Sequence, residues 1–246
     1  MGEMATISER SQSFGAVAEL YDRLRPSYPP GALDACLPRD ARRVVDVGAG
    51  TGKLTAVLAG RGLAIVAVEP DQEMRAVLAV RLPDVDVRGG AAESMPLADA
   101  EVDAVLFGQA WHWADRQRAA LEAARVLAPA GTLAMLWNLS DDRVTWVAEL
   151  ERLTATGAGI SHALDPPALA GFSPGRRADL AWAQAVCADE LVELARTWSA
   201  VSTLPADARD RVLGAVRHLF TTHPDLAGRS EVDLPYVCTT WTYRLR

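Results

Sequence analysis

Three closely spaced glycines mark the segment of the sequence best suited to bind a cofactor. The run VVDVGAGTGKL, from Val44 to Leu54, places Gly48, Gly50 and Gly52 between a strand-like stretch and a helical pattern. Glycine allows positive φ angles in a tight turn, lets the backbone approach a ligand, and leaves the N–H groups of a helix start beside it. The segment therefore predicts a strand, a nucleotide-cofactor loop and a helix.

The spacing of these glycines narrows the class of cofactor. A dinucleotide-binding loop of the form GxGxxG would have its third glycine where this chain has Lys53. A phosphate-binding P-loop would need glycine at Val47 and serine or threonine at Leu54. Both patterns fail, so the spacing disfavours the competing enzyme class, a nicotinamide-dependent reductase.

Two acidic residues flank the loop in positions that suit a nucleoside. Asp46 precedes Gly48 by two residues, and the second strand-like run, LAIVAVE, ends in Glu69, 21 residues beyond Gly48. A carboxylate at the end of the second strand is placed to accept hydrogen bonds from both ribose hydroxyls. Together, VDVGAGTG and this acid-ended strand resemble the class I S-adenosylmethionine-dependent methyltransferases, and the resemblance extends from Tyr21 to Asn138.

Further segments resemble one group within that class, the methyltransferase type 11 enzymes of the trans-aconitate and ubiquinone methyltransferase-like kind, which act on small molecules. The similar segments are YDRLRPSYP at 21–29, AAESMPL at 91–97, VLFGQAWHWAD at 105–115 and RVLAPAGTLAMLWN at 125–138. The last one departs from the group's Arg-x-Leu-x-Pro-Gly-Gly turn, because Ala130 stands in place of the first glycine.

The resemblance implies S-adenosyl-L-methionine as the cofactor and assigns parts of it to residues of this chain. The three glycines would cradle its amino-acid end, Glu69 would hold the ribose, Ala92 and Glu93 would border the adenine, and Gln109 would lie by the sulfonium. The full implied set is Asp46, Gly48, Ala49, Gly50, Gly52, Glu69, Pro70, Met74, Ala92, Glu93, Gln109 and Tyr21.

Methyl transfer from a sulfonium is an in-line displacement that requires alignment and the exclusion of water, and it often needs no base. His112 is the candidate catalytic base, since it follows the fourth core strand. The alternative is that His112 shapes the pocket or caps the following helix. The candidate substrate-pocket residues are aromatic: Tyr28, Trp111, Trp113, Trp137 and Trp146. Their alternative role is ordinary packing in the core or in a lid helix.

Metal and nucleic-acid chemistry are disfavoured. Asp141 and Asp142 precede a helical pattern, where N-capping is commoner than metal binding, so we expect no metal. The net charge of −7 is the wrong sign for a surface that neutralises phosphates. None of the three cysteines follows a proline, as a cytosine C5-methylating nucleophile would. The expected partner is therefore a small-molecule methyl acceptor, with no nucleic acid and no membrane.

The elements that must position these residues follow from hydrophobic periodicity. Strand-like runs begin near Val44, Leu63, Val85, Val102 and Gly131 and alternate with helical patterns. We therefore predict an α/β fold, a Rossmann-like doubly wound and mostly parallel sheet with helices on both faces. The resemblance adds an expectation of seven strands, the last one antiparallel, and of a helical lid.

The 246 residues are predicted to form a single methyltransferase domain. Its parts would be a cofactor-binding core at 41–138, N-terminal lid helices at 10–36, and a substrate-pocket insertion with sheet completion at 139–246. The chain start lacks a signal-peptide pattern, which favours a cytoplasmic protein, either a monomer or a homodimer. A non-catalytic regulatory protein that binds S-adenosylmethionine is the alternative outside enzymes.

Overall fold

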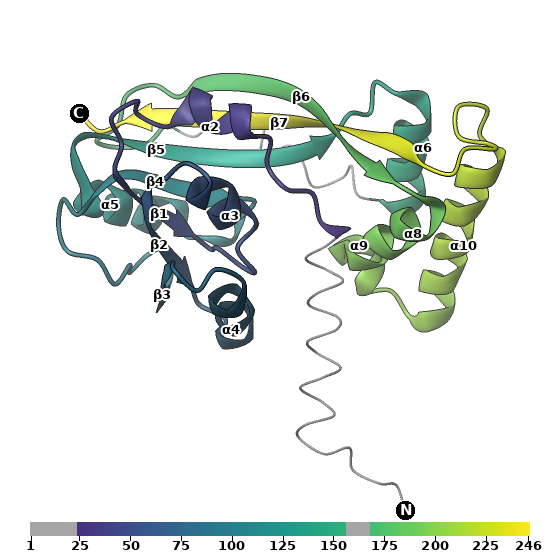
Figure 1. Ribbon diagram of the computed structural model, residues 1–246, viewed down its shortest axis with the longest axis horizontal. Coiled ribbons are helices and arrows are strands. Elements are labelled where there is room, and N and C mark those ends of the chain that lie inside the picture. Colours follow the sequence, from purple (N-terminus) through teal and green to yellow (C-terminus); the bar gives the residue numbers. More distant parts are fainter. Residues whose placement is uncertain (1–23, 156–167) are drawn as a thin grey trace, which may run out of the picture.

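The computed structural model describes residues 24–155 and 168–246, which form one seven-stranded sheet in the order β3-β2-β1-β4-β5-β7-β6 (Figure 1). The pairs within β1 to β5 are parallel, whereas β7 runs antiparallel to both of its neighbours. The predicted sheet and its antiparallel last strand are thus confirmed. The strands are β1 (Arg43–Val47), β2 (Ala64–Glu69), β3 (Asp86–Gly89), β4 (Val102–Gly108), β5 (Leu127–Ser140), β6 (Arg176–Val186) and β7 (Val232–Arg244).

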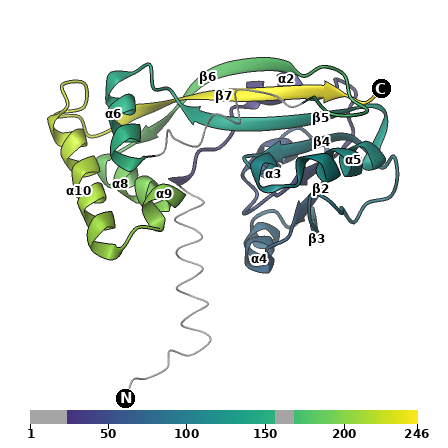
Figure 2. The same ribbon diagram turned by 180° about the vertical axis from the view of Figure 1, so that it is seen from behind.

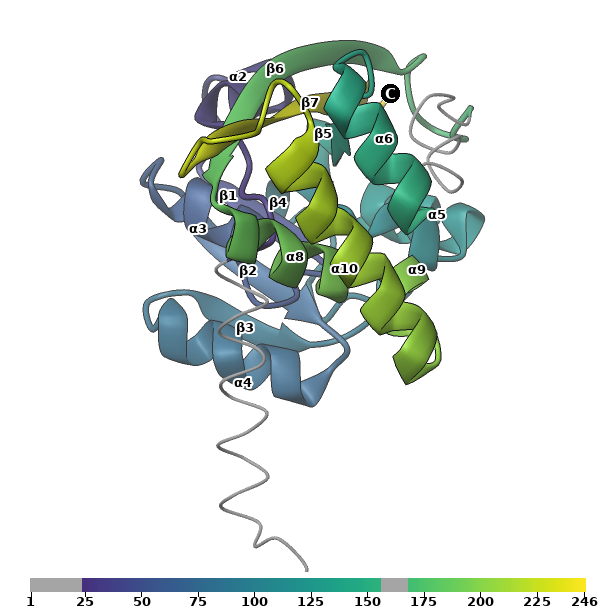
Figure 3. The same cartoon turned by 90° about the vertical axis from the view of Figure 1, so that its right-hand side faces the viewer.

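Helices cover both faces of the parallel strands because alternate strand residues point to opposite sides. Val45 and Phe107 lie in one apolar cluster with α5, whereas Val44 and Leu106 lie in another with α2 and α3. Figure 3 shows α3 and α5 on opposite sides of the sheet. These helices are α2 (Pro30–Cys36), α3 (Lys53–Ala59), α4 (Gln72–Arg81) and α5 (Arg116–Val126).

The remaining helices form a separate group, here called the helical lobe, at the far end of the long strands β5 to β7 (Figures 1 and 2). Its members are α6 (Thr145–Thr154), α8 (Ala188–Thr197), α9 (Ser199–Ser202) and α10 (Ala206–Thr222). The apolar faces of α6, α8 and α10 meet in their own cluster, which includes Trp146, Leu191 and Phe220. The lobe therefore has a hydrophobic core distinct from the clusters that cover the parallel strands.

Strand register places the helical lobe beside the carboxyl ends of the parallel strands. Tyr236 near the start of β7 pairs with both Ser140 at the end of β5 and Trp182 in β6. In a doubly wound sheet, ligands bind beyond these carboxyl ends, where the strand order changes direction. That point lies here between the neighbouring strands β1 and β4.

Some boundaries differ from the sequence-based predictions. Helix α6 begins at Thr145 with Val144 as its N-cap, so the N-capping role expected for Asp141 and Asp142 is wrong. The Asp141 carboxylate instead accepts hydrogen bonds from the backbone and guanidinium of Arg143. Of the segment 10–36 predicted to hold lid helices, residues 10–23 lie outside the described residues, and the rest contains α2. Among the described helices, none is both long and apolar enough to span a membrane.

Candidate functional site

A cavity of about 450 Å³ lies at the carboxyl ends of β1 and β4. Its lining comes from the β1–α3 loop, the β2–α4 turn, the loop after β3, the end of β4 with the turn that follows it, the end of β5, and residues 25–28. The residues that line it are Arg25, Pro26, Tyr28, Val47, Gly48, Ala49, Gly50, Thr51, Lys53, Glu69, Pro70, Met74, Ala91, Ala92, Glu93, Phe107, Gly108, Gln109, Ala110, Trp113, Ala114 and Asn138.

The three glycines of the β1–α3 loop all have positive φ, and their surroundings differ. A Cβ on Gly48 would lie 2.6 Å from the Cβ of Ala110, so this glycine permits the close approach of the loop to the end of β4. A Cβ on Gly52 would lie 3.0 Å from Leu78 Cγ, where the loop packs on α4. At Gly50 the nearest atom would be Met74 Sδ at 4.0 Å, which leaves an open cradle facing the cavity.

The carboxylate of Glu69 is buried at the end of β2 and holds the glycine loop. Its Oε2 accepts a hydrogen bond from the N–H of Gly50 at 2.8 Å, and its Oε1 accepts one from the N–H of Asp71 at 2.9 Å. A carboxylate has about four acceptor positions, so both oxygens retain capacity for a ligand hydroxyl.

Asp46 lies behind the loop and is not among the residues that line the cavity. Its Oδ2 accepts a hydrogen bond from Thr55 Oγ1 at 2.6 Å, which joins β1 to α3. Its Oδ1 is buried without a hydrogen-bond partner among the described residues. Burial raises the pKa of Asp46 to about 7, and the negative charge of Glu69 adds to the rise, while the hydrogen bonds from Thr55 oppose it.

The loop after β3 is fixed to α5 by charged side chains. Glu93 Oε1 accepts a hydrogen bond from the N–H of Asp115, the N-cap of α5, at 2.6 Å. Glu122 accepts one from the N–H of Met95 at 2.7 Å, and Arg125 donates to the Met95 carbonyl at 3.2 Å. This wall of the cavity is therefore held rigidly on the core.

The opposite wall combines the end of β4 with residues 25–28. The Tyr28 ring packs over Gly108, where a Cβ would lie 2.7 Å from the phenolic oxygen. Gln109 adopts a φ of 56°, and its side-chain Nε2 donates to the carbonyl oxygen of Asn138 at 2.9 Å. Trp113 lines the cavity although 80% of it is exposed, so a large apolar ring stands at the rim.

Comparison with known proteins decides the family. A family described as "Methyltransferase domain" matches residues 45–135. An uncharacterized methyltransferase of Mycobacterium tuberculosis is 45% identical over 230 residues, which cover 93% of this chain and 94% of that protein. The chain belongs to the methyltransferases, and its sheet has the class I, Rossmann-like arrangement.

Two further matches extend over most of this methyltransferase. An uncharacterized methyltransferase of Schizosaccharomyces pombe is 30% identical over 223 residues, covering 87% of this chain and 89% of that protein. The solved structure of a putative type II methyltransferase from Anaeromyxobacter dehalogenans superposes with a TM-score of 0.62 at 24% identity, covering 90% of this chain and 97% of that one. The structural match supports the fold.

Most residues predicted to bind the cofactor are brought together in the cavity of this methyltransferase. Asp46 and Gly52 support the loop from behind instead, and Tyr21 lies outside the described residues. The predicted cofactor residues that line the cavity are Gly48, Ala49, Gly50, Glu69, Pro70, Met74, Ala92, Glu93 and Gln109, and the predicted substrate residues that do so are Tyr28 and Trp113.

The other predicted site residues lie elsewhere. His112 is exposed and outside the cavity lining, with its ring against Trp113 at a centroid distance of 4.8 Å. Trp111 and Trp137 are buried in the cluster under α5, and Trp111 meets Phe107 edge to face. Trp146 is buried in the helical lobe, because the apolar face of α6 packs on α8 and α10. Of the four tryptophans predicted to line the substrate pocket, Trp113 alone lines the cavity.

Sequence reasoning did not identify Arg25, Lys53 and Asn138 as cavity residues. Arg25 lies within YDRLRPSYP and Lys53 follows the third glycine. Both segments resemble the family, but the resemblance gave neither residue a role. Asn138 is the last residue of the segment that resembles the family, and the resemblance assigns it no role. Within 24–155 and 168–246, no three His, Cys, Asp or Glu side chains are grouped as a metal ion would require.

Proposed function

We propose that this methyltransferase binds S-adenosyl-L-methionine in the cavity and transfers its methyl group to a small organic molecule. The observation that carries the proposal is the open cradle at Gly50 beside the Glu69 carboxylate, within one cavity that continues to Tyr28 and Trp113. The volume of about 450 Å³ falls in the range of small-molecule sites.

The described residues suit the parts of the cofactor in turn. The glycine loop, with no side chain at Gly48 or Gly50, accommodates the amino-acid end. Glu69 has acceptor capacity for the ribose hydroxyls. Ala92 offers its backbone to the adenine, whereas one oxygen of Glu93 is already used in capping α5. When bound, the cofactor supplies an activated methyl group on a sulfonium.

The groups near the end of β4 indicate catalysis by alignment. Tyr28, Gln109 and Asn138 are neutral polar residues, and the described lining contains no histidine. Such groups hold an acceptor in line with the methyl group and exclude water, which is the main requirement of this displacement. Trp113 supplies an apolar surface that would cover the acceptor once it is bound.

Isothermal titration calorimetry tests the cofactor assignment. The protein is titrated with S-adenosylmethionine, with S-adenosylhomocysteine, and with NADH as the competing cofactor. We expect binding of the first two only. Glu69→Gln retains one acceptor oxygen and replaces the other by a donor, so the affinity should fall by about tenfold or more. Glu73→Gln, an exposed change of the same kind on α4, is the matched control.

A methyl-acceptor screen tests the second half of the proposal. Pools of small organic molecules are incubated with the cofactor, and the release of S-adenosylhomocysteine is measured. Turnover with a small acceptor supports the proposal. Absence of binding of both sulfur nucleosides at millimolar concentration would refute it, and binding without turnover across the screen would favour the regulatory alternative.

A further inference from the structure

One wall of the cavity is a segment without regular secondary structure. Residues 25–29 belong to no helix or strand, yet Arg25, Pro26 and Tyr28 line the cavity. The position of this wall therefore depends on side-chain anchors from other parts of the chain. Loops without such anchors sample several positions and leave a site loosely defined.

Three long-range hydrogen bonds provide these anchors. Gln184 Nε2 in β6 donates to the carbonyl of Leu24 at 3.1 Å, and the Arg25 guanidinium donates to the carbonyl of Thr197 at the end of α8 at 2.6 Å. Asn138 Nδ2 donates to the carbonyl of Ser27 at 2.7 Å. The first two anchors lead away from the cavity to β6 and the helical lobe, whereas Asn138 itself lines the cavity.

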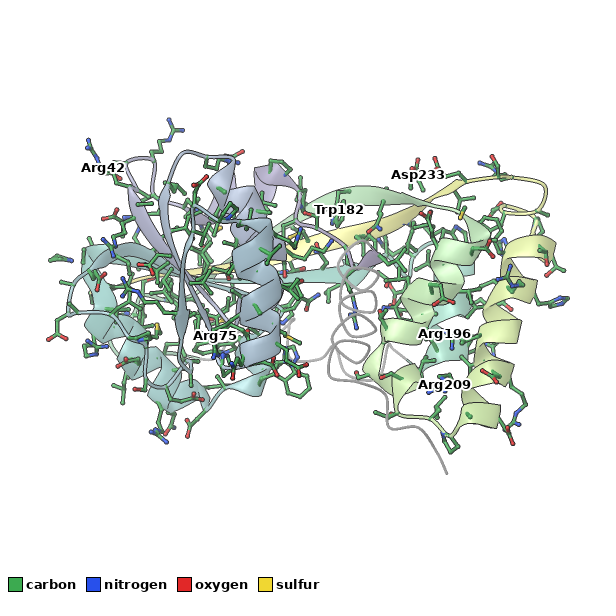
Figure 4. All side chains as sticks on the ribbon, turned by 60° about the horizontal axis from the view of Figure 1, so that its bottom comes forward. Arg42, Arg75, Trp182, Arg196, Arg209 and Asp233 are labelled. Atoms are coloured by element: carbon green, nitrogen blue, oxygen red, sulfur yellow. The ribbon has the colours of Figure 1, made fainter. Side chains whose placement is uncertain are left out.

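Asn138 uses both ends of its side-chain amide. Its Oδ1 accepts a hydrogen bond from Trp182 Nε1 at 3.0 Å, while Nδ2 donates to Ser27. The indole N–H can only donate and a carbonyl can only accept, so these two partners fix the orientation of the amide. The Trp182 ring is held in turn by stacking on Tyr236 at a centroid distance of 5.2 Å. Figure 4 shows Trp182 between the sheet core and the helical lobe.

The same residue also reaches the end of β4. The backbone carbonyl of Asn138 accepts the hydrogen bond from Gln109 Nε2, and Gln109 is strained at positive φ. Asn138 thus joins the wall formed by 25–28 to the residue proposed to lie by the sulfonium. It is the only asparagine in the sequence. Among side chains as short as that of asparagine, only protonated aspartic acid also carries a donor and an acceptor on separate terminal atoms.

We propose that Asn138 is a positioning residue for methyl transfer, which fixes the wall of residues 25–28 opposite Gln109 and so sets the place of the acceptor. This inference rests on the proposed function. It assigns Asn138 to the alignment of the acceptor rather than to the affinity for the cofactor, because its amide bonds reach the wall and β6 and none reaches the glycine loop.

Two substitutions separate positioning from general stability. Asn138→Asp keeps the size and the acceptor for Trp182 but, when ionised, loses the donor to Ser27 and places a negative charge against its carbonyl. Trp182→Phe leaves Asn138 in place and keeps an aromatic ring for Tyr236, but it removes the N–H that orients the amide together with part of the ring volume. Gln117→Glu on the exposed surface of α5 is the control for exchanging an amide for a carboxylate.

Three readouts are measured at pH 8: hydrogen exchange of the peptide covering 24–29, affinity for S-adenosylhomocysteine, and kcat with the best acceptor from the screen. For Asn138→Asp we expect exchange at least about fivefold faster, kcat lowered by about tenfold or more, and affinity within about threefold. Trp182→Phe should give changes of the same kind and smaller size. The control should match the parent protein in all three.

Unchanged exchange of 24–29 in Asn138→Asp overturns the proposal, whatever happens to kcat, since the wall would then not depend on this anchor. Loss of nucleoside affinity with normal exchange also overturns it, because Asn138 would then act on the cofactor. The exchange readout needs no acceptor or turnover, so a failure of the proposed function leaves this test intact. If Asn138→Asp does not fold, Trp182→Phe decides between the same outcomes.

Discussion

Replacing Asp46 by asparagine should change how the stability of the protein depends on pH. The carboxyl of Asp46 is only 1% exposed, one of its oxygens has no partner among the described residues, and burial raises its pKa from 3.8 to about 7. The folded protein therefore holds this proton more tightly than the unfolded chain does. As pH rises through the window from 3.8 to about 7, the unfolded chain gives up its proton first, so stability is lost.

The size of the effect follows from these two values. Between pH 5 and pH 8, the raised pKa of Asp46 lowers the free energy of unfolding by about 2 to 3 kcal/mol. Asparagine does not titrate, and its carbonyl oxygen can still accept the hydrogen bond from Thr55. The stability of Asp46→Asn relative to the parent protein should therefore increase by that amount over the same interval.

Urea unfolding followed by far-UV circular dichroism at several values between pH 5 and pH 8 measures this difference. Asp84→Asn, an exposed substitution with the same change in formal charge, is the control and should run parallel to the parent protein. If Asp46→Asn also runs parallel, within about 0.5 kcal/mol, Asp46 titrates as an ordinary carboxyl and the reasoning from burial is wrong.

Three further substitutions test other parts of the structure. Ala130 has a φ of 62°, so Ala130→Gly should raise the free energy of unfolding by about 0.5 kcal/mol, whereas the control Ala128→Gly should lower it. Urea unfolding measures both changes. A lower free energy of unfolding in both variants would argue against backbone strain at Ala130. Trp113 is 80% exposed, so Trp113→Ala should change the Tm by less than about 2 °C. Because Trp113 is proposed to cover the acceptor, the KM for the acceptor should rise about fivefold. An unchanged KM would show that Trp113 does not contact the acceptor. His112 lies outside the cavity lining, so His112→Gln should leave kcat and its pH profile within about twofold; loss of one limb of the profile would restore the general-base hypothesis.

The core of the fold could be predicted because its information is local. The β-branched runs of β1, β2 and β4 alternate with helical patterns, and the glycine loop lies between β1 and α3. The departure at Ala130 was also visible in the sequence, and the structure shows its consequence, an alanine in the left-handed region. Five strands and the cofactor half of the cavity follow from signals of this kind.

The part of the cavity formed by residues 25–28 and Asn138 could not be predicted in the same way. Asn138 and Ser27 are 111 positions apart, and their hydrogen bond exists only because β5 passes beside the segment before α2. Trp146 illustrates the opposite error. Its large aromatic side chain suggested a substrate-pocket residue, yet the apolar face of α6, which carries Trp146, packs inside the helical lobe. Periodicity shows that a residue is buried on one face, but it does not show which neighbour covers that face.

The helical lobe has an apolar core that draws no residue from β1 to β4. Among the described anchors of the cavity wall, its helices make one direct hydrogen bond, between Arg25 and the end of α8. Substitutions that repack the lobe can therefore move the acceptor wall through this contact while the glycine loop and Glu69 stay in place. Under the proposed function, we therefore expect substitutions in the lobe to change the choice of acceptor while the affinity for the cofactor stays nearly constant.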